Sequence, residues 1–238
     1  MLSIDHIYID GAFVVPHGVE RFDLFNPATE ERIGTVRLAD ADDARLAIAA
    51  AKRAFATFSR TTVDERIALL QRMHDAVVAR EDDLFEAVRL EYGAPVSRGS
   101  WMTKHASSVF LDAIATLREY AFERRMGTAT VVMQPVGVAG LITPWNSNAG
   151  FICGKLAAAI AAGCTAVIKP SEMSALQTKV VTEALHAAGA PAGVFNIVTG
   201  RGDVVGAAIV SSPDVAKVSF TGSTAVGKGI VRAGADTM

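Results

Sequence analysis

The sequence predicts an α/β fold in which an open parallel sheet carries flanking helices and is preceded by an N-terminal helical segment and a β arm. Residues 40–123 place apolar side chains at three- and four-residue steps, the period of helices that pack on a core. Residues 136–220 alternate short apolar runs, rich in β-branched residues, with helical stretches. Such alternation joins strands by right-handed crossovers, so the strands are parallel.

The helical segment carries signals for its helix ends. Asp40 or Asp42 can cap the first helix. Thr62 followed by Glu65 is a capping-box pattern before the next one. Gly93 with Pro95 then stops the second long helix.

An extended stretch separates the helices from the sheet. Residues 128–132 follow Met126-Gly127 and have strand character, which Pro135 limits because proline cannot donate to a central ladder. An edge strand or an arm fits this pattern. No Ser/Gly linker interrupts the chain, so we expect a single domain. Within it we distinguish a helical part (1–120), a β arm (121–135) and an α/β part (136–238).

The α/β part holds the elements that form the sheet. We expect strands over residues 136–142, 166–168, 194–198 and 215–220, helices over 149–162 and 174–188, a short helix between the last two strands and another after Gly222. Ligands of such sheets bind at the carboxyl ends of the strands.

Composition excludes several classes of protein. The 238 residues are 50% hydrophobic and carry a net charge of -2, which fits a globular protein and gives no attraction for nucleic acid or acidic lipid. Two cysteines and no basic, apolar leader favour a reducing cytoplasm. The apolar stretch 149–168 raises the question of a membrane span, but its glycines and β-branched tail favour a buried helix followed by a strand.

Polar or glycine residues follow four of the expected strands, in the ranges 143–146, 169–172, 199–203 and 221–227. In the second range, Lys169 and Glu172 could meet a phosphate or ribose hydroxyls. The alternative is a Ser/Glu helix cap with a solvated lysine, and these residues taken alone favour that alternative.

Residues 222–229 lead from a strand into a helix, where glycines and free amides suit a phosphate. The spacing is not that of the G-x-G-x-x-G fingerprint. It is close to a P-loop, but Gly229 replaces the hydroxyl residue that would bind magnesium.

A complete catalytic site is not visible in the sequence. Asn146 could donate to a developing oxyanion, although an asparagine in a loop is usually a turn former. Cys153 and Cys164 have the surroundings of small core residues rather than of nucleophiles. The five histidines show no metal-ligand spacing, so we expect no metal site.

Several segments, in order along the chain, resemble the aldehyde dehydrogenase superfamily. They are Asn26-Pro27-Ala28-Thr29-Glu30, Pro135-Val136-Gly137-Val138, Thr143-Pro144-Trp145-Asn146, Lys155, Ala161-Ala162-Gly163, Lys169-Pro170-Ser171-Glu172 and Phe220-Thr221-Gly222-Ser223-Thr224-Ala225-Val226-Gly227. The resemblance implies that this chain is the cofactor-binding half of such an enzyme, with the family's Rossmann-like domain.

The resemblance also assigns roles to residues. Lys169 and Glu172 would lie near the adenosine ribose, Ser223 at the pyrophosphate and Asn146 in the oxyanion hole. Because Glu172 would repel an added 2′-phosphate, we favour NAD over NADP, with NADP as the alternative in which Lys169 receives that phosphate. The implied cofactor-binding residues are Ile142, Thr143, Pro144, Trp145, Asn146, Lys169, Ser171, Glu172, Gly202, Asp203, Phe220, Thr221, Gly222, Ser223 and Val226.

In the family, a cysteine thiolate attacks the aldehyde, hydride passes to the nicotinamide, and a glutamate-activated water releases the carboxylic acid. The resemblance implies that this cysteine, this glutamate and the catalytic domain are absent from the 238 residues, so we expect the chain to be inactive alone. It also implies an aldehyde substrate for the full-length enzyme and a homo-oligomer. The alternatives are a non-catalytic nucleotide-binding or assembly module and, far behind, a P-loop phosphohydrolase.

Overall fold

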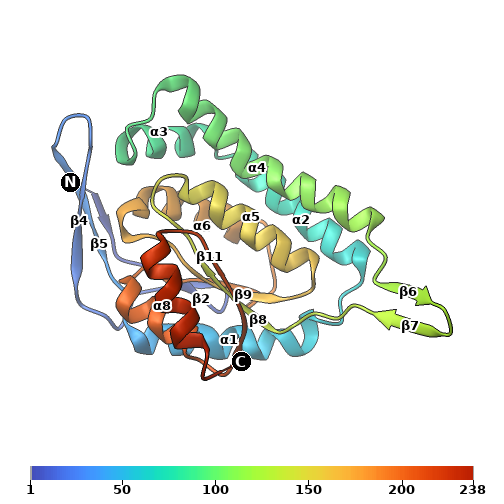
Figure 1. Cartoon of the computed structure of the whole chain (residues 1–238). Helices are drawn as coiled ribbons and strands as arrows, with labels where there is room; N and C mark the ends of the chain where they lie inside the picture. The colour runs from blue at the N-terminus through green and yellow to red at the C-terminus, as the bar shows by residue number, and fades with distance from the viewer. Residues whose placement is uncertain (1, 238) are drawn as a thin grey trace.

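The computed structural model describes residues 2–237 and has a central six-stranded sheet in the order β11-β8-β9-β10-β2-β3 (Figure 1). Four strands are those expected from the sequence: β8 (Val138–Ile142), β9 (Thr165–Lys169), β10 (Phe195–Ile197) and β11 (Val215–Phe220). Each neighbouring pair among them is parallel. The predicted open α/β sheet is therefore confirmed.

Strands from the N-terminal region make this sheet mixed. β2 (Ile7–Ile9) pairs antiparallel with β10, and β3 (Ala12–Val14) pairs antiparallel with β2. A separate sheet has the order β1-β5-β4, formed by Leu2–Ile4, Arg32–Arg37 and Arg21–Phe25. The helical part that we assigned to residues 1–120 thus begins only at residue 41. β1, β2 and β3 have three residues each, too few to show an alternating pattern, whereas β4 and β5, with five and six residues, were missed by the sequence analysis.

Helices cover both faces of the central sheet. They are α1 (Ala41–Phe58), α2 (Val63–Val78), α3 (Glu81–Glu91), α4 (Val96–Glu119), α5 (Asn148–Ala161), α6 (Ala175–Ala187), α7 (Ala207–Val210) and α8 (Thr224–Gly234). Alternation along β9 separates two apolar clusters: Ile168 packs with Phe110 of α4 and Leu156 of α5, whereas Val167 packs with Ala47 of α1 and Ile209 of α7. The sheet therefore lies between two helical layers (Figure 1).

The two predicted helix starts are confirmed, but the second long helix ends at Val78, and Gly93 and Pro95 follow the third helix instead. Asp40 caps α1 through the amides of Asp42 and Asp43. Thr62 N donates to Glu65 Oε2 over 2.7 Å, and Glu65 N donates back to Thr62 Oγ1 over 3.2 Å, which completes the capping box of α2.

The β arm is a hairpin of β6 (Glu123–Met126) and β7 (Ala129–Val132) that projects from the body (Figure 1). Gly127 lies in its turn with φ of 64°, a conformation that glycine adopts without strain. The hairpin falls within the expected range 121–135. Its first strand was not predicted, because three of the four residues of Glu-Arg-Arg-Met are charged and the segment shows no apolar alternation.

One end of the sheet is less covered than the rest. Every residue of β8 and β9 is buried, but β11 is half-buried or exposed, and α8 contains no buried residue. Within residues 2–237, β11 pairs with β8 alone.

The apolar stretch 149–168 forms α5 and β9, as predicted. Among the described residues, no helix has both the length and the apolar character required to cross a membrane.

Candidate functional site

The carboxyl ends of β8, β9 and β11 lie side by side. Ile142 of β8 is in register with Lys169 of β9 on one side and with Phe220 of β11 on the other. Immediately beyond, Thr143 N donates to the Lys169 carbonyl and Thr221 N donates to the Ile142 carbonyl, each over 3.1 Å. Three of the four turns singled out in the sequence therefore meet at one edge of the sheet.

The fourth turn follows β10. Thr199 accepts a hydrogen bond of 2.9 Å from Ala39 N, and Gly200 forms an isolated parallel bridge with Ala39. A single π-helical turn, Gly202–Gly206, then leads into α7. The predicted short helix is present, and its start lies beyond the carboxyl end of β10.

Asp203, in that turn, is held by Arg201 through two hydrogen bonds of 3.0 Å. These bonds are the main reason why the pKa of Asp203 lies below its ordinary value. The charge of Lys169 has a smaller effect in the same direction, so Asp203 lies within electrostatic reach of the β9 turn.

The turn after β8 is held from behind by Asn148, which is fully buried. Its Oδ1 accepts from Thr143 Oγ1 over 2.6 Å, and its Nδ2 donates to Thr178 Oγ1 over 2.7 Å and to the Ser174 carbonyl over 3.3 Å. The Ser174 hydroxyl in turn donates to the Trp145 carbonyl. This network fixes the turn to the start of α6. Sequence reasoning missed it because the partners lie 26 and 30 residues away.

Asn146 lies exposed at the tip of this turn. Its Oδ1 accepts a hydrogen bond of 2.9 Å from Ser147 N. This contact orients the side chain, and the NH₂ group on the opposite side of the amide is the donor that an oxyanion would need. Trp145 beside it is also exposed, with its ring 5.7 Å from that of Tyr92.

Lys169 and Glu172 form an ion pair in the turn after β9. Lys169 Nζ lies 3.2 Å from Glu172 Oε2, and the lysine side chain is only 6% exposed. The solvated-lysine interpretation is therefore wrong. The helix cap is nevertheless real, since Ser171 Oγ accepts from Met173 N over 3.3 Å. The Glu172 carboxylate, a quarter exposed, remains accessible to a ligand.

Helix α8 begins at Thr224, too soon after β11 to leave the loop that a P-loop requires. Ser223 caps the helix through a hydrogen bond of 3.3 Å from Val226 N. Gly227 and Lys228 lie inside α8, so their amides cannot wrap a triphosphate from a loop. A Cβ at Gly222 would lie 2.5 Å from the Phe220 ring, which explains that glycine by packing. The geometry counts against the phosphohydrolase.

Both cysteines are buried, as expected. Burial raises the pKa of the Cys153 thiol to about 12, so it is not a thiolate at neutral pH. Lys155, one of the residues that carried the resemblance, donates to Ser219 Oγ over 2.7 Å, and burial lowers its pKa.

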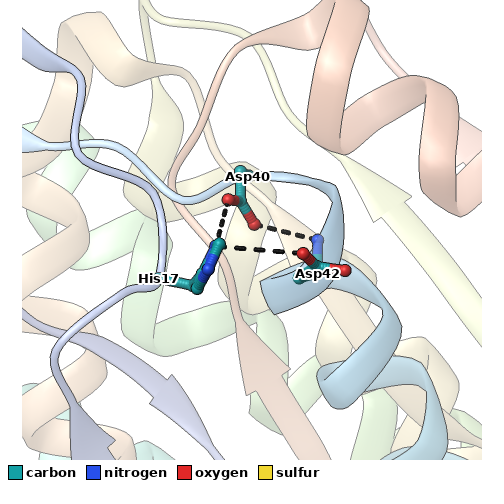
Figure 2. Close-up of side chains that lie close together, drawn as sticks. All are labelled: His17, Asp40 and Asp42. Atoms are coloured by element: carbon teal, nitrogen blue, oxygen red, sulfur yellow. Dashed lines mark hydrogen bonds and ion pairs between the residues drawn. The ribbon is translucent and has the colours of Figure 1, made fainter.

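A group of metal-ligating types that the sequence did not reveal lies at the start of α1. Figure 2 shows His17, Asp40 and Asp42 pointing toward one another, with ligand atoms all within 4.8 Å. His17 Nδ1 is 2.5 Å from Asp40 Oδ2 and 3.9 Å from Asp42 Oδ2. The hydrogen bond to Asp40 raises the pKa of His17. Since Asp40 already caps α1 with its other oxygen, a histidine-supported helix cap accounts for the cluster.

The fold is an open α/β domain in which three family-like turns share one edge of the sheet, and comparison with known proteins identifies its family. The aldehyde dehydrogenase family model matches residues 13–238. The chain belongs to this family. It is 41% identical over 240 residues to 3-succinoylsemialdehyde-pyridine dehydrogenase from a Pseudomonas species, covering 100% of this chain and 50% of that relative.

Comparison with solved structures supports the same family assignment. A mutant of aldehyde dehydrogenase C from Pseudomonas syringae, in complex with NAD⁺ and octanal, matches with a TM-score of 0.95 and 38% identity over 98% of this chain and 48% of that one. Aldehyde dehydrogenase from Bartonella henselae matches with a TM-score of 0.96 and 33% identity over 100% and 51%. The chain thus spans about half the length of the relatives it matches.

Proposed function

We propose that this chain is the dinucleotide-binding half of an NAD(P)-dependent aldehyde dehydrogenase, which oxidises an aldehyde to a carboxylic acid when the other half is present. The observation that carries this proposal is the register of Ile142 with Lys169 and Phe220, because it gathers the three family-like turns at one edge. Family membership supports the chemistry. Bound NAD would supply the hydride acceptor.

The residues at the edge fit a dinucleotide. Glu172 would accept hydrogen bonds from ribose hydroxyls. The first amides of α8 have no carbonyl partner one helical turn earlier, so those following Ser223 suit a pyrophosphate. A Cβ at Gly202 would meet nothing within 4 Å, so packing does not explain this glycine, whereas an adenine lying close to the backbone would. Val226 offers an exposed apolar side chain on the first turn of α8 for the other side of that ring.

The ion pair between Lys169 and Glu172 favours NAD over NADP. A 2′-phosphate would approach the Glu172 carboxylate, while the lysine charge is already compensated. We expect Glu172→Gln to lower the affinity for NAD roughly tenfold, which corresponds to the loss of one charge-assisted hydrogen bond. The affinity for NADP should fall much less. Isothermal titration of both cofactors measures this. Glu86→Gln, at an exposed pair with Arg89 on α3, is the matched control and should change neither affinity. Equal weakening of NAD and NADP by Glu172→Gln would exclude the ribose role.

On the aldehyde side, the Asn146 amide would stabilise the oxyanion. Cys153 and Cys164 are buried, and Cys153 is held as a thiol, so neither supports nucleophilic attack. The purified 238-residue chain should therefore bind NAD without forming NADH from propanal. Steady NADH production would contradict the assignment of the nucleophile to the other half.

Similarity does not select the aldehyde. The name of one relative specifies a pyridine-bearing semialdehyde, and the complex of another holds octanal. We propose a cytoplasmic homo-oligomer, as the composition and the family suggest. The second candidate, a nucleotide-binding or assembly module, is favoured by the open β11 edge and the uncovered α8. This candidate predicts that the chain binds NAD, and that adding a complementary half does not produce aldehyde oxidation.

A further inference from the structure

A row of charged side chains of alternating sign borders the proposed cofactor edge. In order, its members are Glu20, Arg201, Asp203, Lys169 and Glu172. The row is continuous because Ile197 of β10 is in parallel register with Ile168 of β9, and the turn Gly202–Gly206 contacts β9. Each cation in the row has a carboxylate on both sides, so neither cation is free to attract an anion.

The Arg201 guanidinium is held by both of its neighbours. Its Nε and Nη2 atoms each donate to one carboxylate oxygen of Asp203 over 3.0 Å, and its Nη1 lies 3.5 Å from Glu20 Oε1. Two parallel N–H groups that grip two oxygens are also the arrangement by which arginine binds a phosphate. Asp203 therefore occupies the part of the guanidinium that a phosphate would use.

The pair of Arg201 and Asp203 is open to exchange with a ligand. The two side chains are 49% and 65% exposed, so an incoming anion can reach the guanidinium without disturbing the core. Exposed ion pairs add little stability, and the fold does not depend on this one. Asp203 lies only two residues from Arg201, however, so it competes with any ligand at a high effective concentration.

We propose that Asp203 is a specificity-determining residue, which keeps Arg201 from binding a 2′-phosphate and thereby directs the chain to NAD rather than NADP. The inference rests on the proposed function, which places the adenosine half of the dinucleotide at this edge. It adds a second device to the one proposed for Glu172. Glu172 would repel the phosphate beside β9, whereas Asp203 withholds a cation beside β10.

Asp203→Asn tests the proposal, because asparagine keeps the size of the side chain but removes its charge and one of the two acceptor oxygens. Isothermal titration of the purified chain with NAD and with NADP gives the ratio of the two affinities. The affinity for NADP relative to NAD should rise roughly tenfold, the size of one charge-assisted hydrogen bond. An unchanged ratio would overturn the proposal.

Asp10→Asn is the matched control. Asp10 is an exposed aspartate paired with Arg53 over 2.9 Å, and it lies beside Gly193, which precedes β10, away from the cofactor edge. Its replacement makes the same change in net charge and frees an arginine in the same way. The affinity ratio should stay within about twofold of that of the parent chain.

Arg201→Gln, added to Asp203→Asn, identifies the group that receives the phosphate. If the gain comes from the freed guanidinium, the double variant should lose it and return to within about twofold of the parent ratio. If the gain persists without Arg201, Asp203 acts by repulsion alone and the proposal is wrong.

A third ligand separates this proposal from the proposed function. Adenosine 2′,5′-bisphosphate carries the 2′-phosphate without the nicotinamide half. If the parent chain binds NAD and Asp203→Asn leaves the ratio unchanged, the specificity proposal fails and the cofactor site stands. If the bisphosphate binds to Asp203→Asn through Arg201 while NAD gives no heat, the phosphate site stands and the proposed function fails. Heat from none of the three ligands would overturn both.

Discussion

Replacing Asn148 with alanine tests whether the turn that carries Asn146 is held in place by the buried network. Asn148 makes three hydrogen bonds, to Thr143, Thr178 and the Ser174 carbonyl, at 2.6, 2.7 and 3.3 Å. Alanine removes all three and leaves the buried Thr143 hydroxyl without its acceptor. The turn then keeps only the hydrogen bond from the Ser174 hydroxyl to the Trp145 carbonyl as its side-chain attachment to the start of α6.

The cost follows from the number of bonds. Net contributions of about 1 kcal/mol per bond, with part of a desolvation penalty for the Thr143 hydroxyl, give roughly 3 kcal/mol. For a chain of this length, each kcal/mol shifts the melting temperature by about 2–4 °C, so Asn148→Ala should melt about 6–12 °C lower. Because the loosened turn is part of the proposed cofactor edge, NAD should also bind at least about fivefold more weakly, about 1 kcal/mol.

Asn196 provides the matched control. It too is fully buried and makes three hydrogen bonds, to the Ala166 carbonyl, the Gly193 carbonyl and the Asp10 amide, over 3.2, 3.0 and 2.9 Å. Asn196→Ala should lower the melting temperature by a similar amount and leave the NAD affinity of the remaining folded chain within about twofold. Calorimetry and NAD titration measure both quantities. The reasoning fails if Asn148→Ala melts within about 2 °C of the parent, or if both variants weaken NAD equally.

Two further predictions concern helix starts. Burial raises the pKa of Glu91 to about 8, although the amides of Leu176 and Gln177 donate to it over 2.7 and 3.1 Å. Since this folded-state pKa exceeds the ordinary 4.5, stability is complete below that value and falls as the pH rises toward 8. Glu91→Gln should remove that loss, so the melting temperature of the variant should rise relative to that of the parent chain as the pH increases from 5 to 8. A difference in melting temperature that stays constant across this window would contradict the assignment. Ser223→Ala should cost about 1 kcal/mol of stability by removing the cap of α8, and it should also weaken NAD binding. Ser223→Thr should keep both the stability and the NAD affinity. If the alanine variant retains its NAD affinity, Ser223 does not belong to the pyrophosphate site.

The predictable part of the site follows from sheet geometry. Once the apolar runs ending at Ile142, Lys169 and Phe220 are recognised as parallel strands, their ends must share one edge, because crossovers return the chain to the same side. The segments after those runs could therefore be grouped from the sequence before any distance was known. The same periodicity predicted flanking helices, and the structure places them on both faces of the sheet, in keeping with the complete burial of β8 and β9.

The remainder depends on contacts between distant segments, which periodicity does not encode. Lys169 looks solvated in the sequence, yet the fold buries it against Glu172. Asn148 reads as an ordinary loop residue until Thr178, 30 residues later, is placed beside it. His17 meets Asp40 across a separation of 23 residues. Pair interactions of this kind become visible only when the elements have been packed.

Support is uneven along the proposed cofactor edge, and this has a functional consequence. The turn after β8 is fixed by a buried network, and β9 lies between two partners, but β11 pairs with β8 alone and α8 buries no side chain. A ligand that contacts both Glu172 and Ser223 must therefore bind to a helix that the rest of the chain supports weakly, and we expect holding that helix in place to reduce its affinity. A second half that packs on β11 and α8 would remove that cost without touching the cofactor. In a dehydrogenase half, cofactor affinity should consequently rise when this end of the sheet is covered.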